Sequence, residues 1–277
     1  MSRNNQSRLN APQPAFSADP VSAFSQTHIS ISVPSEFVEL PSRGRFYPPN
    51  HPLHGKTSIE IKHMTAKEED ILSSEALIKK GIVLDRLIQS IILDKNIDPS
   101  SLLICDRNAI FVACRITGYG PDYEAIAGCP VCGEKHNINY DLSSFESPLT
   151  ELPSGVELSN RGTCLVRLPK SNKLIEFRLL SGYDEKVNLN VDKTRLVTSQ
   201  VTDQMKSLIL TIDGDSDIAL VNAFSTEMPA FDSRFLRNII KNVTPNTELK
   251  YDLNCDKCGN QSVVEVPIGV KFFWPDA

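Results

Sequence analysis

The chain has 277 residues, of which 40% are hydrophobic and 23% are charged, and its formal net charge at pH 7 is −5. This length allows one large domain or two ordinary ones, and the composition excludes a collagen, a coiled coil and a wholly disordered chain. The longest unbroken apolar run, Ala109–Cys114, is far shorter than the roughly 20 residues of a membrane span. The acidic balance argues against general nucleic-acid binding, although it leaves room for a local basic patch.

Residues 1–34 are rich in Ser, Asn, Gln, Pro and Ala and contain few charges. Such a segment cannot bury enough apolar surface to offset the entropy lost on ordering, so we expect a disordered N-terminal arm. The first residues also lack the apolar stretch of a secretory signal. Seven cysteines in such a chain are more typical of metal ligands or core thiols in a reducing compartment than of disulfides.

The sequence after the arm indicates an internal duplication. Val38–Ser42 resembles Val166–Lys170, and Ile59–Thr65 resembles Ile175–Ser181. An ordered series of matches at nearly fixed spacing predicts two copies of one unit, the first over residues 35–145 and the second over residues 146–277. Three single residues also have counterparts at one constant spacing: Asp106 in Asp232, Cys129 in Cys255 and Cys132 in Cys258.

In the first unit the pattern predicts a β-hairpin followed by helices. The alternation at Ile59 and Ile61 is typical of a strand, and Thr65–Glu68 has the form of a capping box that starts a helix. A later helix is predicted to begin with Asp106 as its N-cap and to end before Gly120. Between them, apolar residues at helical spacing indicate an amphipathic helix: Leu84, Leu87, Ile88, Ile91 and Ile92.

The second unit repeats this order. Ile175 and Phe177 alternate as in a strand, and Ser181–Asp184 is a weaker helix start. A helix is predicted from Asp232 to about Asn242, and a return strand over Val263–Val266. One more helix is indicated by apolar residues at helical spacing: Leu196, Val197, Val201, Met205, Leu208, Ile209 and Ile212.

Each unit ends in a C-x-x-C-G turn, and these turns are the strongest local signal in the chain. Two thiolates separated by two residues can bind one metal ion from a tight turn, and the glycine lets backbone N–H groups face the sulfurs. Structural zinc takes four protein ligands, so two turns would complete one site. We therefore predict a structural Zn²⁺ bound by Cys129, Cys132, Cys255 and Cys258 and shared between the two units.

Three other interpretations of these turns stay open. His136 follows Cys132 closely and could complete a different ligand set, although the second turn has no matching histidine. A thioredoxin-like redox site would need a helix after the C-x-x-C, whereas polar β-like sequence follows here. The turns could also carry free thiols without metal. Cys105, Cys114 and Cys164 lie in apolar surroundings and are expected to be core residues.

No catalytic motif is found, and no catalytic residue is predicted. The chain lacks G-x-S-x-G, H-E-x-x-H and the phosphate-binding P-loop pattern. Asp213–Asp217 imitates the start of a calcium loop, but Ile218 and Phe224 stand where glycine and glutamate are needed. The connection Pro41–Lys56, with arginines and aromatic residues, suits either a protein interface or a solvated extension. The aromatic residues near Trp274 are expected to cap the core.

Several segments together resemble the baseplate hub and hub-assembly proteins of T-even-type contractile-tail bacteriophages, over most of residues 36–277. The motifs are specific as an ordered set and weak one by one. The segments that carry the resemblance are Leu40–Pro48, His51–Leu53, Ile61–Leu72, Cys105–Ile110, Arg115–Glu124 and Cys129–Gly133.

The resemblance implies a non-enzymatic virion or assembly component that is made in the host cytoplasm and binds other baseplate or hub proteins. We expect no small-molecule substrate and no membrane among its partners, and nucleic acid is not expected to be one either. The expected fold is α+β: two duplicated units, each a β-hairpin, helices and a zinc-knuckle hairpin, related by a pseudo-twofold axis and joined by the four-cysteine zinc site. The alternative function is a zinc-ribbon adaptor that binds nucleic acid, as in transcription; an enzyme has no positive support.

Overall fold

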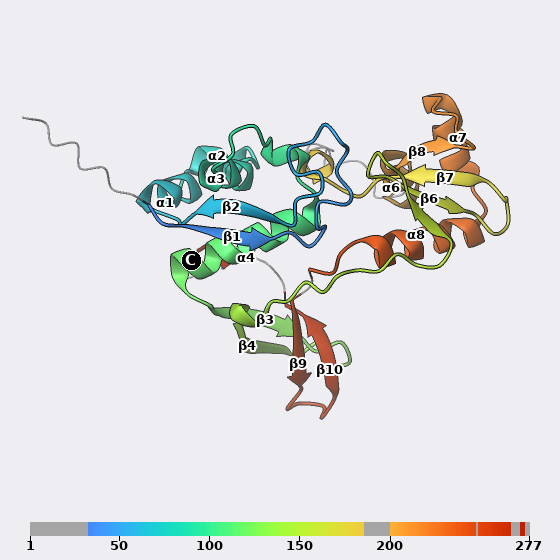
Figure 1. Cartoon of the computed structure of the whole chain (residues 1–277). Helices are drawn as coiled ribbons and strands as arrows, with labels where there is room; N and C mark the ends of the chain where they lie inside the picture. The colour runs from blue at the N-terminus through green and yellow to red at the C-terminus, as the bar shows by residue number, and fades with distance from the viewer. Residues whose placement is uncertain (1–32, 186–199, 248, 267–271, 275–277) are drawn as a thin grey trace, which may run out of the picture. The chain divides into compact units, whose positions relative to one another are not determined.

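A computed structural model describes residues 33–185, 200–247, 249–266 and 272–274 (Figure 1). Within these ranges the chain belongs to one compact unit that starts at Val33. The predicted disordered arm, apart from its last two residues, lies outside the described residues. Helices and antiparallel strands are both present, so the predicted α+β class is confirmed.

The strands form small antiparallel sheets. The first hairpin pairs β1 (Ser35–Glu39) with β2 (Ser58–Lys62), as the alternation at Ile59 and Ile61 predicted. Two other two-stranded sheets and one four-stranded sheet, of order β5-β6-β7-β8, complete the set. Their strands are β3 (Asp122–Gly128), β4 (Lys135–Asp141), β5 (Val156–Leu158), β6 (Cys164–Arg167), β7 (Leu174–Phe177), β8 (Ile209–Ile212), β9 (Lys250–Asn254) and β10 (Gln261–Glu265).

Helices connect and cover these sheets, and their buried side chains join one apolar core with the strands. No helix in the described ranges is both long and apolar enough to cross a membrane. The helices are α1 (Ala66–Leu72), α2 (Glu75–Lys79), α3 (Val83–Ile91), α4 (Ile104–Tyr119), α6 (Gln200–Leu208), α7 (Ile218–Glu227) and α8 (Ala230–Val243), with short 3-10 turns η2 (Pro99–Ser101) and η3 (Leu142–Ser144).

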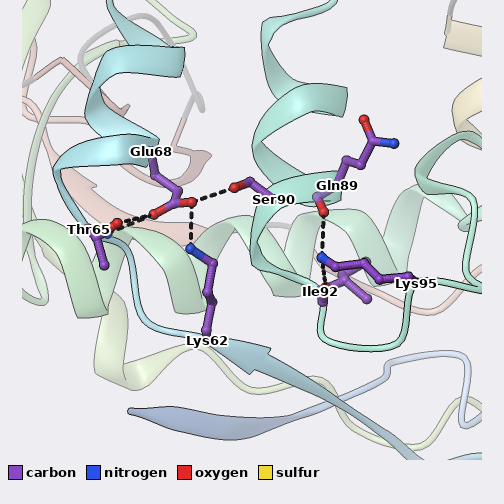
Figure 2. Close-up of polar contacts among 7 residues, drawn as sticks. All are labelled: Lys62, Thr65, Glu68, Gln89, Ser90, Ile92 and Lys95. Atoms are coloured by element: carbon purple, nitrogen blue, oxygen red, sulfur yellow. Dashed lines mark hydrogen bonds and ion pairs between the residues drawn. The ribbon is translucent and has the colours of Figure 1, made fainter. Parts of the chain in front are cut away.

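The predicted capping box at the start of α1 is present and is part of a larger polar cluster (Figure 2). The backbone N–H and the hydroxyl of Thr65 donate to one carboxylate oxygen of Glu68, at 3.0 and 2.6 Å. The other oxygen accepts from Lys62 Nζ at 2.6 Å and from the hydroxyl of Ser90 on α3. Because Glu68 is fully buried, these donors are what allow the carboxylate to stay ionised there.

Two details of the predicted helices were wrong. Asp106 is not the N-cap of α4, because the helix already begins at Ile104. Its buried carboxylate instead accepts hydrogen bonds from the backbone N–H and hydroxyl of Ser42 and from the hydroxyl of Tyr47, at 2.6–2.9 Å. The helix predicted as far as Ile212 ends at Leu208, and Ile209–Ile212 forms β8, which pairs with β7. Leu196 and Val197 of that prediction lie outside the described residues.

The connection Pro41–Lys56 is packed rather than extended into solvent. Phe46, Tyr47 and Leu53 are buried, and the ring of His51 stacks on that of Tyr47 with centroids 4.3 Å apart. A Cβ at Gly162 would lie only 2.6 Å from the carbonyl oxygen of Tyr47, so this connection also touches the β5–β6 turn closely. Its aromatic residues therefore stabilise the fold and are not available to a partner.

The aromatic residues near the C-terminus cap the core, as predicted. Phe272 and Phe273 are buried. Their rings make edge contacts with Tyr123 and Phe111, with centroid distances of 5.1 and 5.7 Å. The indole N–H of Trp274 donates to the backbone carbonyl of Leu72 at 3.1 Å. These residues cover the face of α4 that carries Phe111.

Candidate metal centre

The first C-x-x-C-G sequence forms the turn between β3 and β4. The backbone N–H of Cys129 donates to the carbonyl of Glu134 at 2.8 Å, and that of Gly133 donates to the carbonyl of Cys129 at 2.9 Å. Gly133 has a φ of 71°, which is the left-handed region that side chains with a Cβ rarely adopt. The glycine therefore lets the chain turn back into β4 directly after the second thiol.

The second C-x-x-C-G sequence forms the turn between β9 and β10 with the same hydrogen bonds. The N–H of Cys255 donates to the carbonyl of Asn260 at 2.9 Å, and that of Gly259 donates to the carbonyl of Cys255 at 2.8 Å. Gly259 has a φ of 69°. Both hairpins are visible in Figure 1, and β10 contacts β3.

The two turns bring all four predicted ligands together. The Sγ atoms of Cys129 and Cys258 are 3.7 Å apart, and those of Cys132 and Cys255 are 3.6 Å apart. All four ligand atoms lie within 4.8 Å of one another. Four sulfurs at about 2.3 Å from a tetrahedral zinc would lie about 3.8 Å from one another, so this donor set fits the ion.

Backbone N–H groups around the turns favour the thiolate form of one cysteine in each pair. The N–H groups of Cys132 and Val131 lower the pKa of Cys129. Burial raises the pKa of Cys255, but the N–H of Cys258 and the side chain of His136 outweigh burial and lower it to about 6. Metal binding needs deprotonated thiols, so both turns are prepared for a cation.

The other cysteine of each pair, Cys132 or Cys258, has a raised pKa instead. The N–H of Asn260 lowers the pKa of Cys258, but burial and the three neighbouring sulfurs raise it to about 12. Cys132 shows the same direction, because burial and the sulfur of Cys255 outweigh the N–H of Glu134. Four adjacent thiols cannot all ionise without a compensating charge, and a bound divalent cation would supply that charge.

His136 lies beside the four cysteines rather than replacing one of them. Its Nε2 is 3.2 Å from the Sγ of Cys255, which is hydrogen-bond distance to sulfur. A residue in this position can orient a ligand and tune its basicity without binding the metal itself. The alternative ligand set built on His136 is therefore not needed to complete four donors.

Cys105, Cys114 and Cys164 are buried away from this cluster, as predicted for core thiols. In the described ranges, the four-cysteine cluster is the only group of three or more cysteine, histidine or acidic side chains close enough to hold a metal ion. The acidic loop before α7 has other partners: Asp213 forms an ion pair with Lys173 at 2.8 Å, and Asp217 accepts from the N–H of Ala219 at the start of α7.

The four thiols lie close enough together to be compatible with one metal site in a protein of small antiparallel sheets and helices. Four protein ligands around one ion would leave no position open for substrate, which is the pattern of a structural site. The family model described as "T4 bacteriophage base plate protein" matches residues 36–274. The chain therefore belongs to the T4 bacteriophage base plate protein family. No curated protein and no solved structure matches the chain.

Membership of this family indicates a structural protein of the phage baseplate, which places it in the virion tail and in contact with other baseplate proteins. It also suggests a structural rather than an enzymatic role.

Proposed function

We propose that this chain is a baseplate hub protein, a structural component or an assembly factor, which acts through protein–protein contacts and catalyses no reaction. The proposal combines the family match with the absence of catalytic motifs from the sequence. Assembly would take place in the host cytoplasm before the tail is complete. The observation that carries the structural role is the convergence of Cys129, Cys132, Cys255 and Cys258 from two separate hairpins.

The proposed ion is Zn²⁺. Soft thiolates favour zinc over magnesium or calcium, and the four-cysteine set is the usual closed form of a structural zinc site. Cys129 and Cys255 are buried, whereas Cys132 and Cys258 are exposed. The ion would therefore lie at the surface end of the two hairpins, where it holds β3–β4 against β9–β10.

The proposed duplication explains why the two hairpins are alike, and three sets of contacts support it. The first is the helix start. Thr65 donates its N–H and hydroxyl to Glu68, and Lys62 pairs with that carboxylate. Ser181 donates its N–H and hydroxyl to Asp184 in the same way, and Arg178 pairs with Asp184.

The second set of contacts links a helix to the first hairpin of its unit. Oδ1 of Asp106, in the first turn of α4, accepts from the backbone N–H of Ser42 at 2.9 Å. Oδ1 of Asp232, in the first turn of α8, accepts from the backbone N–H of Lys170 at 2.9 Å. Ser42 and Lys170 occupy matching places in the two repeated sequences.

The third set is the pair of thiol turns, whose hydrogen bonds and glycine conformations agree residue by residue. These agreements support two copies of one unit, over residues 35–145 and 146–277, related by a pseudo-twofold axis that passes near the metal. In this arrangement each copy supplies two thiols to one zinc ion.

Mass spectrometry of purified particles and of baseplate assembly intermediates would test the proposed function. A resident hub component should be present in both samples at a fixed ratio to other baseplate proteins. An assembly factor should be present in the intermediates and depleted from the finished particles. Absence from both samples would contradict the proposal.

A further inference from the structure

The solvent-facing side of α8 carries a row of cations. Arg234, Arg237 and Lys241 are exposed and lie on one side of the helix, because their spacing of three and four residues matches the helical repeat. The only carboxylate on this helix, Asp232, is buried and accepts from the backbone N–H groups of Lys170 and Ser171. We call Phe231, Arg234, Arg237 and Lys241 the α8 face.

No acidic side chain within the described ranges pairs with these cations, whereas Lys79 pairs with Glu75 and Lys173 with Asp213. Other exposed cations such as Lys67 and Lys80 are also unpaired in these ranges, but they lie on different elements, whereas Arg234, Arg237 and Lys241 lie on one side of a single helix. In the described part of the chain, the only side-chain hydrogen bond from the three cations is that of Arg237 Nε to the carbonyl of Ser233, at a long 3.4 Å. A basic row on a chain of net charge −5 is therefore available for charges from another molecule.

An exposed aromatic ring lies at the N-terminal end of the same helix. Phe231 has 58% of its surface accessible, and Lys170 Nζ lies 5.8 Å from the centre of its ring. Aromatic and arginine side chains are the residue types that contribute most to the binding energy of protein interfaces. The exposed apolar ring of Phe231 would be stabilised by burial against a partner. The α8 face therefore combines an apolar anchor with adjacent positive charge.

The corresponding face of α4 is covered. On the proposed duplication, Arg237 matches Phe111 and Lys241 matches Arg115, and both α4 residues are buried. Phe273 packs against Phe111 there. No described residue covers the α8 face in the same way, so one copy of the unit has this helix face closed and the other has it open.

We propose that the α8 face docks a carboxylate-rich segment of another baseplate protein, with Phe231 as the apolar anchor; this rests on the proposed function and names the chemistry of the partner. The positions 234–241 span about 10 Å at 1.5 Å per helical residue, which matches two turns of a partner helix that carries Asp or Glu at intervals of three or four residues. Nucleic acid fits less well, because the row is short and the net charge of the chain repels phosphates at longer range.

Charge reversal of the full chain tests the proposal directly. Fluorescence anisotropy of labelled poly-L-glutamate and of a labelled DNA duplex would be measured at low salt against the parent chain and the double variant Arg234→Glu with Lys241→Glu. The matched control is Lys67→Glu with Lys80→Glu, which changes the net charge equally at exposed sites on other elements. We expect poly-L-glutamate to bind the parent and the control alike, and the α8 variant about tenfold or more weakly. No binding to the parent, equal loss in the control, or tighter binding of DNA than of poly-L-glutamate would overturn the proposal.

A photo-crosslinking residue at Asn238, an exposed position between the cations, would identify the partner during phage assembly. The expected product is a crosslink to a baseplate protein at a segment rich in Asp and Glu, which the Arg234→Glu and Lys241→Glu variant loses. A crosslink to nucleic acid, to lipid or to a protein segment without carboxylates would overturn the proposal. If the chain proves absent from baseplates and their intermediates, the proposed function fails, while the poly-L-glutamate measurement still decides the chemistry of the α8 face.

Discussion

Glu68 is a buried carboxylate that stays charged because of the side chains around it. Burial alone would raise its pKa, but hydrogen bonds from Lys62, Ser90 and Thr65 outweigh burial and lower it from 4.5 to about 2. A folded-state pKa below the unfolded value means that the group stabilises the fold above pH 4.5. That contribution is lost as the pH falls from about 5 to about 2.

The prediction is a fall of about 3 kcal/mol in the free energy of unfolding over that pH range from Glu68 alone, since one pKa unit corresponds to about 1.4 kcal/mol. Urea titrations at several pH values would measure the free energy of unfolding. Plotted against pH, this free energy should change more steeply for the parent chain than for Glu68→Gln. Glu69→Gln, at the exposed neighbouring position, should keep the parent slope. Equal slopes in the parent and Glu68→Gln would contradict this account.

At the scale of residues, local patterns were predictable and long-range roles were not. The capping box at Thr65 and the two thiol pairs of the four-cysteine cluster were visible in the sequence, because both depend on short fixed spacings. The role of Asp106 as a buried hydrogen-bond acceptor was not predicted. Its carboxylate accepts hydrogen bonds from Ser42 and Tyr47, which are distant in the sequence. A buried acid near a helix start looks the same in sequence as an N-cap.

At the scale of elements, each thiol turn depends on a glycine in an unusual backbone conformation. Gly133 has a φ of 71°, which favours glycine, although a Cβ at this position would have free space, with no atom within 4 Å. Gly133→Ala should therefore destabilise the β3–β4 turn by about 1 kcal/mol through backbone strain alone. Gly259→Ala should have a similar effect, since its φ is 69° and its surroundings are also open.

Gly128, at the end of β3, provides the matched control. It also has open space where a Cβ would lie, but its φ is not positive. Gly128→Ala should leave the urea midpoint unchanged or raise it slightly, because alanine restricts the unfolded chain. If Gly128→Ala lowered the urea midpoint as much as Gly133→Ala, the cost would come from the added side chain and not from the backbone conformation of Gly133.

The elements themselves were predicted unevenly. The hairpins and the longer amphipathic helices were found because their apolar periodicity is strong, as for α3 and α8. The strand β8 was mistaken for the end of a helix, since Ile209 and Ile212 fit a helical spacing and only pairing with β7 selects the strand. The packing of the connection Pro41–Lys56 was also open in the sequence, because its aromatic residues are buried by distant segments.

At the scale of the whole molecule, the four-cysteine cluster is one of several contacts between residues 35–145 and residues 146–277. The backbone N–H of Ile104 donates to the carbonyl of Leu180, and that of Gly182 donates to the carbonyl of Leu102, both at 3.0 Å. The β5–β6 turn contacts Tyr47 at Gly162. These contacts are independent of the thiol turns, so the two parts should stay together when the metal is lost.

Metal removal should therefore loosen one region and leave the rest folded. The purified chain is expected to contain one zinc ion, measured by plasma mass spectrometry, and Cys129→Ser and Cys255→Ser should lose it together with solubility. Cys164→Ser, which changes a buried thiol outside the cluster, should keep its zinc. Structural zinc contributes about 10–16 kcal/mol of apparent binding free energy in small finger peptides, where metal and folding are coupled. Here that coupling should be confined to the two hairpins.

Hydrogen exchange with and without a chelator would locate the effect. Backbone amides of β3, β4, β9 and β10 should exchange faster after zinc removal, because these strands form two-stranded sheets that are marginally stable alone. Amides of α3 and α4, which lie in the apolar core, should keep their protection. Loss of protection throughout the described residues would mean that the metal controls global folding, and unchanged exchange in the hairpins would mean that the four thiols stabilise nothing.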